Sequence, residues 1–133
     1  MNTVTRILVV DDDPGFLKGI ERLLRAKGFE VTGYSSAEEF QAHADLGDAA
    51  CLILDIHLSG ISGIELRRQQ RSSGSNVPVI FITGNGSEAT QEAAMAAGCA
   101  AYLEKPCPAK TLVDAISAAL QPRAGTLAPP DNM

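Results

Sequence analysis

Five runs of apolar residues, each the length of one strand, alternate along the chain with stretches of helical period. These runs are RILVV (6–10), FEVTGY (29–34), ACLILD (50–55), VPVIFIT (77–83) and AAYLEKP (100–106). A run without polar alternation, such as the first, is typical of a strand covered on both faces, as in a parallel sheet. Parallel strands need crossover helices, which cover both faces. The sequence therefore predicts an α/β fold with a five-stranded parallel sheet and helices on both faces.

Capping signals mark the starts of the predicted helices. Asp13 suits the N-cap of a first helix, with Pro14 at its first position and Gly28 after its end. Serine and glutamate at capping-box spacing predict two further helices, at Ser36 with Glu39 and at Ser62 with Glu65, the latter helix running to about Gln70. An alanine-rich helix should end at Gly98, and a last helix should begin at about Pro108.

Length and composition indicate one domain. The 133 residues, 45% of them hydrophobic, suffice for one core but not for a second folded domain. We expect the domain to span residues 1–121. The segment PRAGTLAPPDNM (122–133) contains three prolines and is predicted to be a flexible tail or the stub of a linker.

Charge and hydropathy argue against two classes of partner. The net charge is −5 and no stretch is rich in Lys or Arg, so direct nucleic-acid binding is not expected. No apolar run approaches the ~18 residues that a membrane span needs, and the apolar run within the first ten residues is too short for a signal peptide. Three cysteines without a C-x-x-C pair, Cys51, Cys99 and Cys107, fit a reducing compartment. We expect a cytoplasmic protein that does not contact membranes.

Polar residues follow four of the apolar runs. Asp11 and Asp12 follow the first run, and Asp55, Thr83 and Lys105 stand at the ends of the third, fourth and fifth. The carboxyl ends of parallel strands meet at one edge of a sheet, where functional residues gather. Three carboxylates, a hydroxyl and an ammonium are thus predicted to converge. Because crowded carboxylates repel one another, a bound cation such as Mg²⁺, which prefers oxygen ligands, would explain the acidic cluster.

These residues carry a resemblance to a known family. The acidic pair after ILVV, Asp55 in LILDIHLSGISGIEL, Thr83 in VPVIFITGNG, Tyr102, and Lys105 with Pro106 in AYLEKP resemble the receiver domain of two-component response regulators. The resemblance covers residues 5–121 and implies a flavodoxin-like, CheY-like (βα)5 fold. VPVIFITG and AGCAAYLEKP are most similar to receivers of LuxR-type and FixJ-type regulators.

The resemblance implies a magnesium site and a phosphoacceptor. Asp55 would accept the phosphoryl group and also contact Mg²⁺. Asp12 would be a direct ligand, Asp11 would act mainly through water, and the backbone carbonyl of His57 would complete the protein's share of the ligands.

The resemblance also assigns the remaining residues. Lys105 would stabilise the charge of the transferred group, and the Lys105–Pro106 bond would be cis. Thr83 would hydrogen-bond the phosphoryl group, and Tyr102 would turn inward, so that both act as the switch. The protein would be a signalling domain that promotes its own phosphorylation and dephosphorylation rather than an enzyme.

The expected partners follow from this role. The phosphoryl donor would be a sensor histidine kinase or a histidine phosphotransfer protein. The signal would pass to a downstream protein or to an output domain that this chain lacks, and phosphorylation could produce a homodimer.

Two departures and two alternatives accompany this interpretation. Ser59 stands where the family commonly has proline, and Gly84 where alanine is more usual; both changes should loosen the switch loops. Asp11-x-Asp13 after a strand also resembles the nucleophile motif of haloacid dehalogenases, but no acidic pair follows Lys105 and Asp55 would have no role. A flavodoxin-like interaction module that no longer accepts phosphate is the second alternative.

Overall fold

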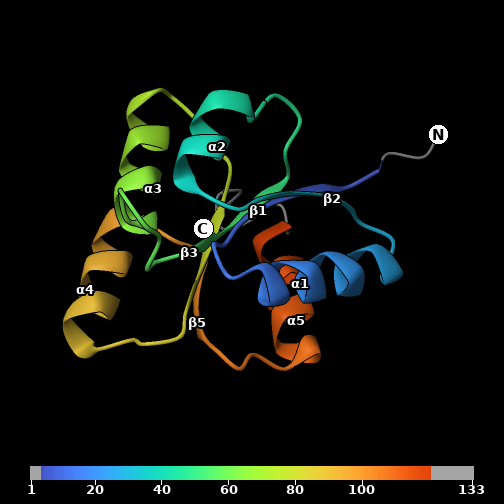
Figure 1. Cartoon of the computed structure of the whole chain (residues 1–133). Coiled ribbons are helices and arrows are strands. Elements are labelled where there is room, and N and C mark those ends of the chain that lie inside the picture. The colour runs from blue at the N-terminus through green and yellow to red at the C-terminus, as the bar shows by residue number, and fades with distance from the viewer. Residues whose placement is uncertain (1–3, 121–133) are drawn as a thin grey trace, which may run out of the picture.

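The computed structural model describes residues 4–120, in which five strands and five helices alternate (Figure 1). The strands are β1 (Arg6–Val10), β2 (Glu30–Tyr34), β3 (Cys51–Asp55), β4 (Val79–Thr83) and β5 (Ala101–Glu104). The helices are α1 (Pro14–Ala26), α2 (Ala37–His43), α3 (Gly63–Ser72), α4 (Glu88–Ala97) and α5 (Ala109–Leu120). All ten predicted elements are present; β2 to β5 begin one or two residues later than predicted.

The five strands form one parallel sheet in the order β2-β1-β3-β4-β5. Strand β3 lies at the centre, with β1 and β4 as its neighbours. Val10 of β1 pairs with Leu54 of β3. The residues that follow them, Asp11 and Asp55, are therefore adjacent. This confirms the predicted fold class and brings Asp11 and Asp55 to the same edge.

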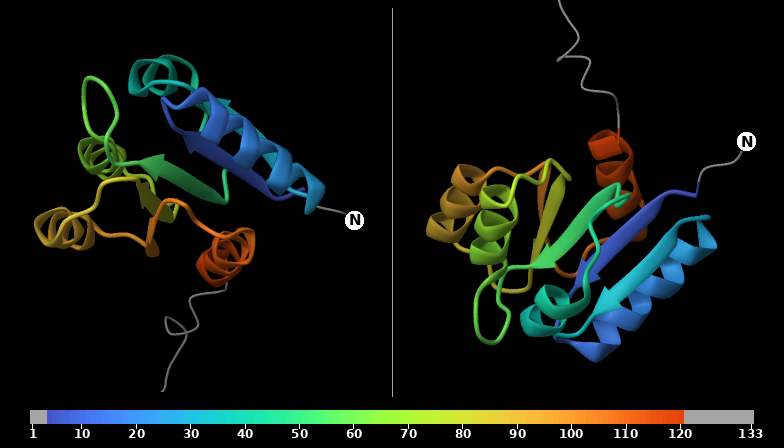
Figure 2. Two further views of the ribbon diagram at one scale, coloured as in Figure 1. Left: turned by 60° about the horizontal axis from the view of Figure 1, so that its bottom comes forward. Right: turned by 90° about the horizontal axis from the view of Figure 1, so that it is seen from above.

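Helices cover both faces of the sheet, as Figure 2 shows from two further directions. Helices α1 and α5 pack on one face against alternate residues of β1, β3 and β4, and α2, α3 and α4 pack on the other. Both faces are apolar, and β3 and β4 are buried along their whole length. The continuous apolar runs of the sequence are thus explained by burial on two sides.

The predicted N-caps are present, but neither capping box closes as predicted: at the second, Glu65 N–H donates to Ser62 Oγ while the Glu65 carboxylate pairs with Arg68. Asp13 accepts hydrogen bonds from the backbone N–H groups of Gly15 and Phe16 and starts α1. Ser36 accepts a hydrogen bond from the N–H of Glu39, but the Glu39 carboxylate returns to Ser35, not to Ser36 as a capping box requires. The backbone N–H of Ser35 lies 2.8 Å from Glu39 Oε1, so the box is shifted by one residue.

Part of the chain lies outside this description. The predicted tail (122–133) and the predicted domain boundary at residue 121 fall beyond residue 120. Among residues 4–120, no helix combines the length and the apolar character that crossing a bilayer requires.

Candidate functional site

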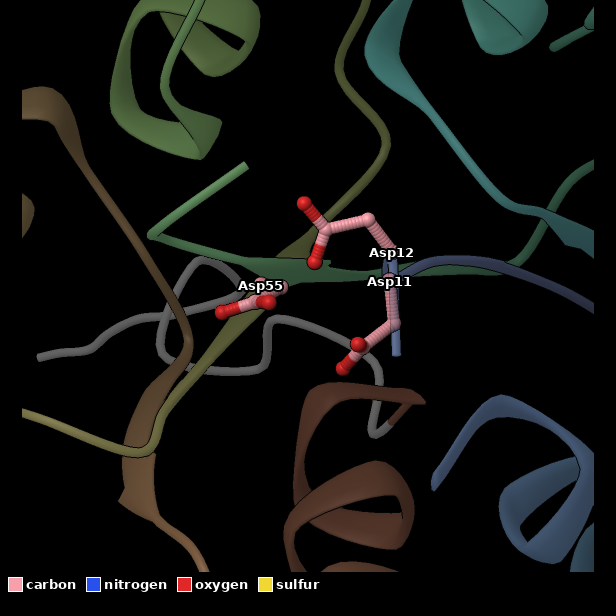
Figure 3. Close-up of side chains that lie close together, drawn as sticks. All are labelled: Asp11, Asp12 and Asp55. Carbon is pink, nitrogen blue, oxygen red and sulfur yellow. The ribbon is translucent and has the colours of Figure 1, made fainter. Parts of the chain in front are cut away.

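Three carboxylates meet at the carboxyl edge of the sheet (Figure 3). Asp11 and Asp12 follow β1, and Asp55 is the last residue of β3. One oxygen atom from each carboxylate lies within 4.8 Å of the other two. Asp11 and Asp55 are only 2% and 5% exposed, whereas Asp12 is exposed to solvent. The site is therefore a buried acidic floor with one carboxylate at its rim.

Lys105 supplies the positive charge nearest to this cluster among residues 4–120. Its Nζ lies 2.9 Å from Asp11 Oδ2 and 3.7 Å from Asp55 Oδ2. The ammonium also lies 4.2 Å from the centre of the Phe16 ring, a cation–π contact from α1. The backbone N–H of Lys105 donates to the carbonyl of Thr83, and the Lys105–Pro106 bond is cis, as the resemblance implied.

The charges shift each other's titration. Burial raises the pKa of Asp11, and the nearby charge of Asp55 adds to the increase. Hydrogen bonds from Asp13 N–H and Lys105 oppose it. Burial alone would lower the pKa of Lys105, but its hydrogen bond to Asp11 and the surrounding carboxylates raise that pKa above its ordinary value. Ionisation of Asp11 is therefore less favourable in the folded protein than in a free aspartate, even beside the Lys105 ammonium.

The donor set fits a hard divalent cation. Mg²⁺ is bound at about 2.1 Å by oxygen ligands in an octahedron, so its opposite ligands lie about 4.2 Å apart. One oxygen of each carboxylate lies within 4.8 Å of the other two, so the three side chains are close enough to share one ion. An ion would also remove the repulsion among the three acids. Asp11, Asp12 and Asp55 therefore suit magnesium.

The loop after β3 borders the cluster. The backbone N–H of His57 donates to Asp55 Oδ1 at 3.2 Å, and the Nε2 atom of its ring lies 3.1 Å from the carbonyl oxygen of Asn85. Ser59 donates to Asp12 Oδ2 from its backbone N–H at 3.1 Å and from its hydroxyl at 3.3 Å. His57 and Ser59 thus fix the orientation of two of the three carboxylates.

Thr83 and Tyr102, the predicted switch residues, lie on neighbouring strands. Thr83 is fully buried at the end of β4, and its hydroxyl accepts a hydrogen bond from Asn85 N–H. The hydroxyl of Tyr102 on β5 is buried and has no hydrogen-bond partner among residues 4–120. It occupies space left by Gly86, where a Cβ atom would lie 2.5 Å from it. Burial and the charge of Glu104 raise the pKa of Tyr102.

Sequence reasoning missed two neighbours of the site. Phe16 belongs to the apolar pattern of α1, and no local signal shows that its ring lies beneath Lys105. Ser59 stands out in the sequence only because it replaces a proline, whereas in the structure it donates hydrogen bonds to Asp12. Asp13 is the reverse case: it caps α1 as predicted and is not part of the carboxylate cluster.

Comparison with known proteins identifies one family. Residues 7–117 match the family described as the response regulator receiver domain. The response regulator protein TodT of Pseudomonas putida F1 is 35% identical over 115 residues, which are 86% of this chain and 51% of that protein. The transcriptional regulatory protein FixJ of Azorhizobium caulinodans is 34% identical over 112 residues, 84% of this chain and 53% of that protein. The chain spans about half the length of these relatives.

Solved structures agree with the sequence matches. A CheY-like receiver domain protein from Methanospirillum hungatei JF-1 has a TM-score of 0.83 at 29% identity, covering 89% of this chain and 94% of that one. The crystal structure of FixJ-N has a TM-score of 0.82 at 33% identity, covering 91% and 96%.

Proposed function

Because the chain belongs to the receiver-domain family of two-component response regulators, we propose that Asp55 accepts a phosphoryl group in a Mg²⁺-dependent reaction. The family is a signalling family, not one of classical enzymes. The observation that carries the proposal is the position of Asp55: a nearly buried carboxylate at the end of the central strand, beside two further carboxylates and the Lys105 ammonium.

The acidic cluster would hold the cation. The family uses Mg²⁺ at an acidic pocket, and here Asp11, Asp12 and Asp55 would hold it together with the backbone carbonyl of His57. When bound, Mg²⁺ supplies positive charge next to the negatively charged oxygens of the group being transferred. Ser59 would keep Asp12 oriented toward the cluster through its two hydrogen bonds.

Asp55, Lys105 and Thr83 would carry out the transfer of the phosphoryl group. A carboxylate oxygen of Asp55 forms a bond to phosphorus while the bond from phosphorus to the donor's histidine nitrogen breaks. Lys105, already 3.7 Å from Asp55 Oδ2, would pair with an oxygen of the transferred group. Thr83 would donate its hydroxyl hydrogen to another oxygen, with Asn85 moving along because its N–H is bonded to that hydroxyl.

The family match excludes one alternative interpretation and leaves the other to experiment. The haloacid dehalogenase reading needs Asp13 beside Asp11 in the site, but Asp13 caps α1 and the family match is to receivers. A module that no longer accepts phosphate remains an outcome of the labelling experiment described below.

Receivers of response regulators interact with histidine kinases and output domains. For this chain we propose a sensor histidine kinase or a histidine phosphotransfer protein as donor. A groove of about 410 Å³ between α1 and α5 would receive it, because Phe16 lines that groove and also contacts Lys105. A downstream protein, an output domain outside this chain, or a second copy would read the surface of α4, β5 and α5.

Incubation with acetyl phosphate and Mg²⁺ is expected to add one phosphoryl group, about 80 Da, to the wild-type protein. Intact mass spectrometry after rapid acid quenching measures the gain. Asp55→Asn should show no gain, and EDTA should abolish it. Asp114→Asn, which removes an exposed carboxylate of α5, is the matched control and should label like wild type. Equal labelling of Asp55→Asn, or no labelling with Mg²⁺ present, would overturn the proposal.

Gly86→Ala is expected to drive Tyr102 outward and impair the switch. The new Cβ would lie 2.5 Å from the Tyr102 hydroxyl and 3.0 Å from Glu104 Oε2, and the tyrosine ring can move away. Exposure removes the effect of burial, so the pKa of Tyr102 should fall toward 10, its ordinary value. Ultraviolet titration in a Tyr34→Phe background, which leaves Tyr102 as the sole tyrosine, measures this shift.

The matched control for this variant is Gly84→Ala. At Gly84 a Cβ would meet its nearest atom, Lys105 Cδ, at an ordinary 3.6 Å, so Tyr102 should titrate as in the parent. An unchanged pKa in Gly86→Ala would show that the space at Gly86 does not hold the tyrosine inward.

A further inference from the structure

A polar cavity lies at the opposite edge of the sheet from Asp55. It has a volume of about 560 Å³ and is bordered by the start of β4 at Val79, by Ala100 before β5, and by the ends of α3 and α4. Figure 1 shows α3 and α4 side by side on one face of the sheet. None of the residues of the proposed phosphorylation site lines this cavity.

Two arginines of α3 line the cavity and reach the end of α4. Arg67 Nε donates to the carbonyl of Gly98 at 2.8 Å, and Arg71 Nη1 donates to the carbonyl of Ala97 at 2.9 Å. The position that a Cβ on Gly98 would occupy is 2.7 Å from Arg71 Nη1 and 3.6 Å from Arg67 Nη2. Both guanidinium groups therefore converge on one small region, which the absence of a side chain at Gly98 leaves open.

The helix end does not use all the donors of these arginines. A guanidinium has five N–H groups. Arg67 donates through Nε and Nη1, and Arg71 through Nη1 alone, so Arg67 Nη2 and the Nε and Nη2 of Arg71 have no acceptor among residues 4–120. These free donors belong to groups that line the cavity.

The two positive charges also lack a counterion. No carboxylate of residues 4–120 forms an ion pair with Arg67 or Arg71. Burial lowers the pKa of Arg67, and the neighbouring charge of Arg71 lowers it further. Arg67 is half-buried and Arg71 is exposed, so their neighbouring positive charges repel each other, and an anion between them would relieve this repulsion.

We propose that this cavity is an anion site that binds the phosphate group of a small molecule through Arg67 and Arg71. Guanidinium groups match phosphate oxygens with pairs of N–H donors. The cavity is larger than one phosphate group, and Pro78 and Val79 offer an apolar wall for an attached organic part. A bound phosphate group would contact Arg67 and Arg71 of α3 beside the end of α4, at the edge of the sheet opposite to the acidic cluster.

Titration of ¹⁵N-labelled Asp55→Asn protein in EDTA, followed by amide NMR shifts, tests this proposal without involving the phosphorylation site. Inorganic phosphate and glycerol 2-phosphate are added separately at constant ionic strength. Saturable shifts are expected at Gly98, Cys99 and Ala100. Binding of either probe supports the site, and the tighter one distinguishes free phosphate from a phosphate ester as its ligand.

Two variants separate a built site from general charge attraction. Arg71→Gln should weaken binding about tenfold, and Arg71→Lys should fall in between, because lysine keeps the charge but loses the paired donors. Arg68→Gln removes the same charge from the residue directly after Arg67. Arg68 pairs with Glu65 and does not line the cavity, so this variant should bind like the parent. Equal weakening in Arg68→Gln and Arg71→Gln, or shifts that never saturate, would overturn the proposal. Thermal unfolding of each variant verifies that it is folded.

Discussion

Asp11→Asn is expected to stabilise the metal-free protein while weakening its binding of Mg²⁺. The pKa of Asp11 is raised by burial and by Asp55, so its ionised form costs free energy that a neutral amide does not. We therefore expect the free energy of unfolding of the metal-free variant to be higher than that of the wild type. The same change removes one of the three clustered carboxylates, and Mg²⁺ affinity should fall by about tenfold or more.

The stabilisation should depend on pH in a defined direction. Because the folded pKa of Asp11 lies above 3.8, the folded state holds its proton more tightly than the unfolded state. Wild-type stability from this group therefore falls as pH rises from 3.8 through the raised pKa. The advantage of Asp11→Asn should be full at neutral pH and vanish below pH 3.8, where both side chains are neutral.

Urea unfolding in EDTA at pH 7.5 and pH 4, with calorimetric titration of Mg²⁺, measures both effects. Asp13→Asn is the matched control, because it removes a neighbouring charge that lies outside the carboxylate cluster. The helix start is preserved, since asparagine caps a helix as well as aspartate does. This control should leave stability and Mg²⁺ affinity close to wild type. A destabilised Asp11→Asn protein would mean that the ion pair with Lys105 outweighs the cost of burying the carboxylate.

Lys105→Met is expected to destabilise the metal-free protein and to slow its phosphorylation. The variant leaves Asp11 and Asp55 without their countercharge, and an unpaired buried charge costs several kcal/mol. Because the Lys105 side chain is 19% exposed, we expect a smaller loss of about 1–2 kcal/mol. Losing a cation aimed at the transferred group should lower the labelling rate by about 100-fold.

Urea unfolding measures the stability of Lys105→Met, and the rate of mass gain with acetyl phosphate measures its phosphorylation. Saturating Mg²⁺ should restore most of the lost stability, because it neutralises the same carboxylates. Lys110→Met removes an exposed lysine of α5 that pairs with Asp114 at 3.0 Å, and this control should change neither property appreciably. Wild-type labelling kinetics in Lys105→Met would show that the ammonium takes no part in transfer.

Alkaline unfolding provides an independent check on Lys105. Its folded pKa is raised above 10.5 by Asp11 and the neighbouring carboxylates, so its contribution to stability is complete below pH 10.5. That contribution is lost as pH rises through the raised pKa. The stability difference between wild type and Lys105→Met should thus stay constant from pH 8 to 10 and shrink at higher pH.

Local patterns in the sequence were sufficient for the fold. Continuous apolar runs indicate strands buried on both faces, and the caps at Asp13, Ser36 and Ser62 indicate where helices start. Both signals can be recognised in the sequence because strand burial and helix capping depend on residues only a few positions apart. The polar residues after the strands then had to meet, since parallel strands share one carboxyl edge. The acidic cluster of Asp11, Asp12 and Asp55 follows from this rule alone.

Contacts across loops were decided only by the tertiary structure. Ser59 and Asp12 are 47 residues apart, and their hydrogen bonds depend on the path of the loop after β3. The Tyr102 hydroxyl lies beside Gly86 because the loop after β4 brings this glycine against two side chains of β5, those of Tyr102 and Glu104. Arg67 and Arg71 look like ordinary polar residues of α3 until α4 places its last carbonyls against them. The sequence by itself determined which residue types reach each edge of the sheet, through period and capping. The partners that each side chain meets there depend on loop geometry and packing, which no short-range pattern encodes.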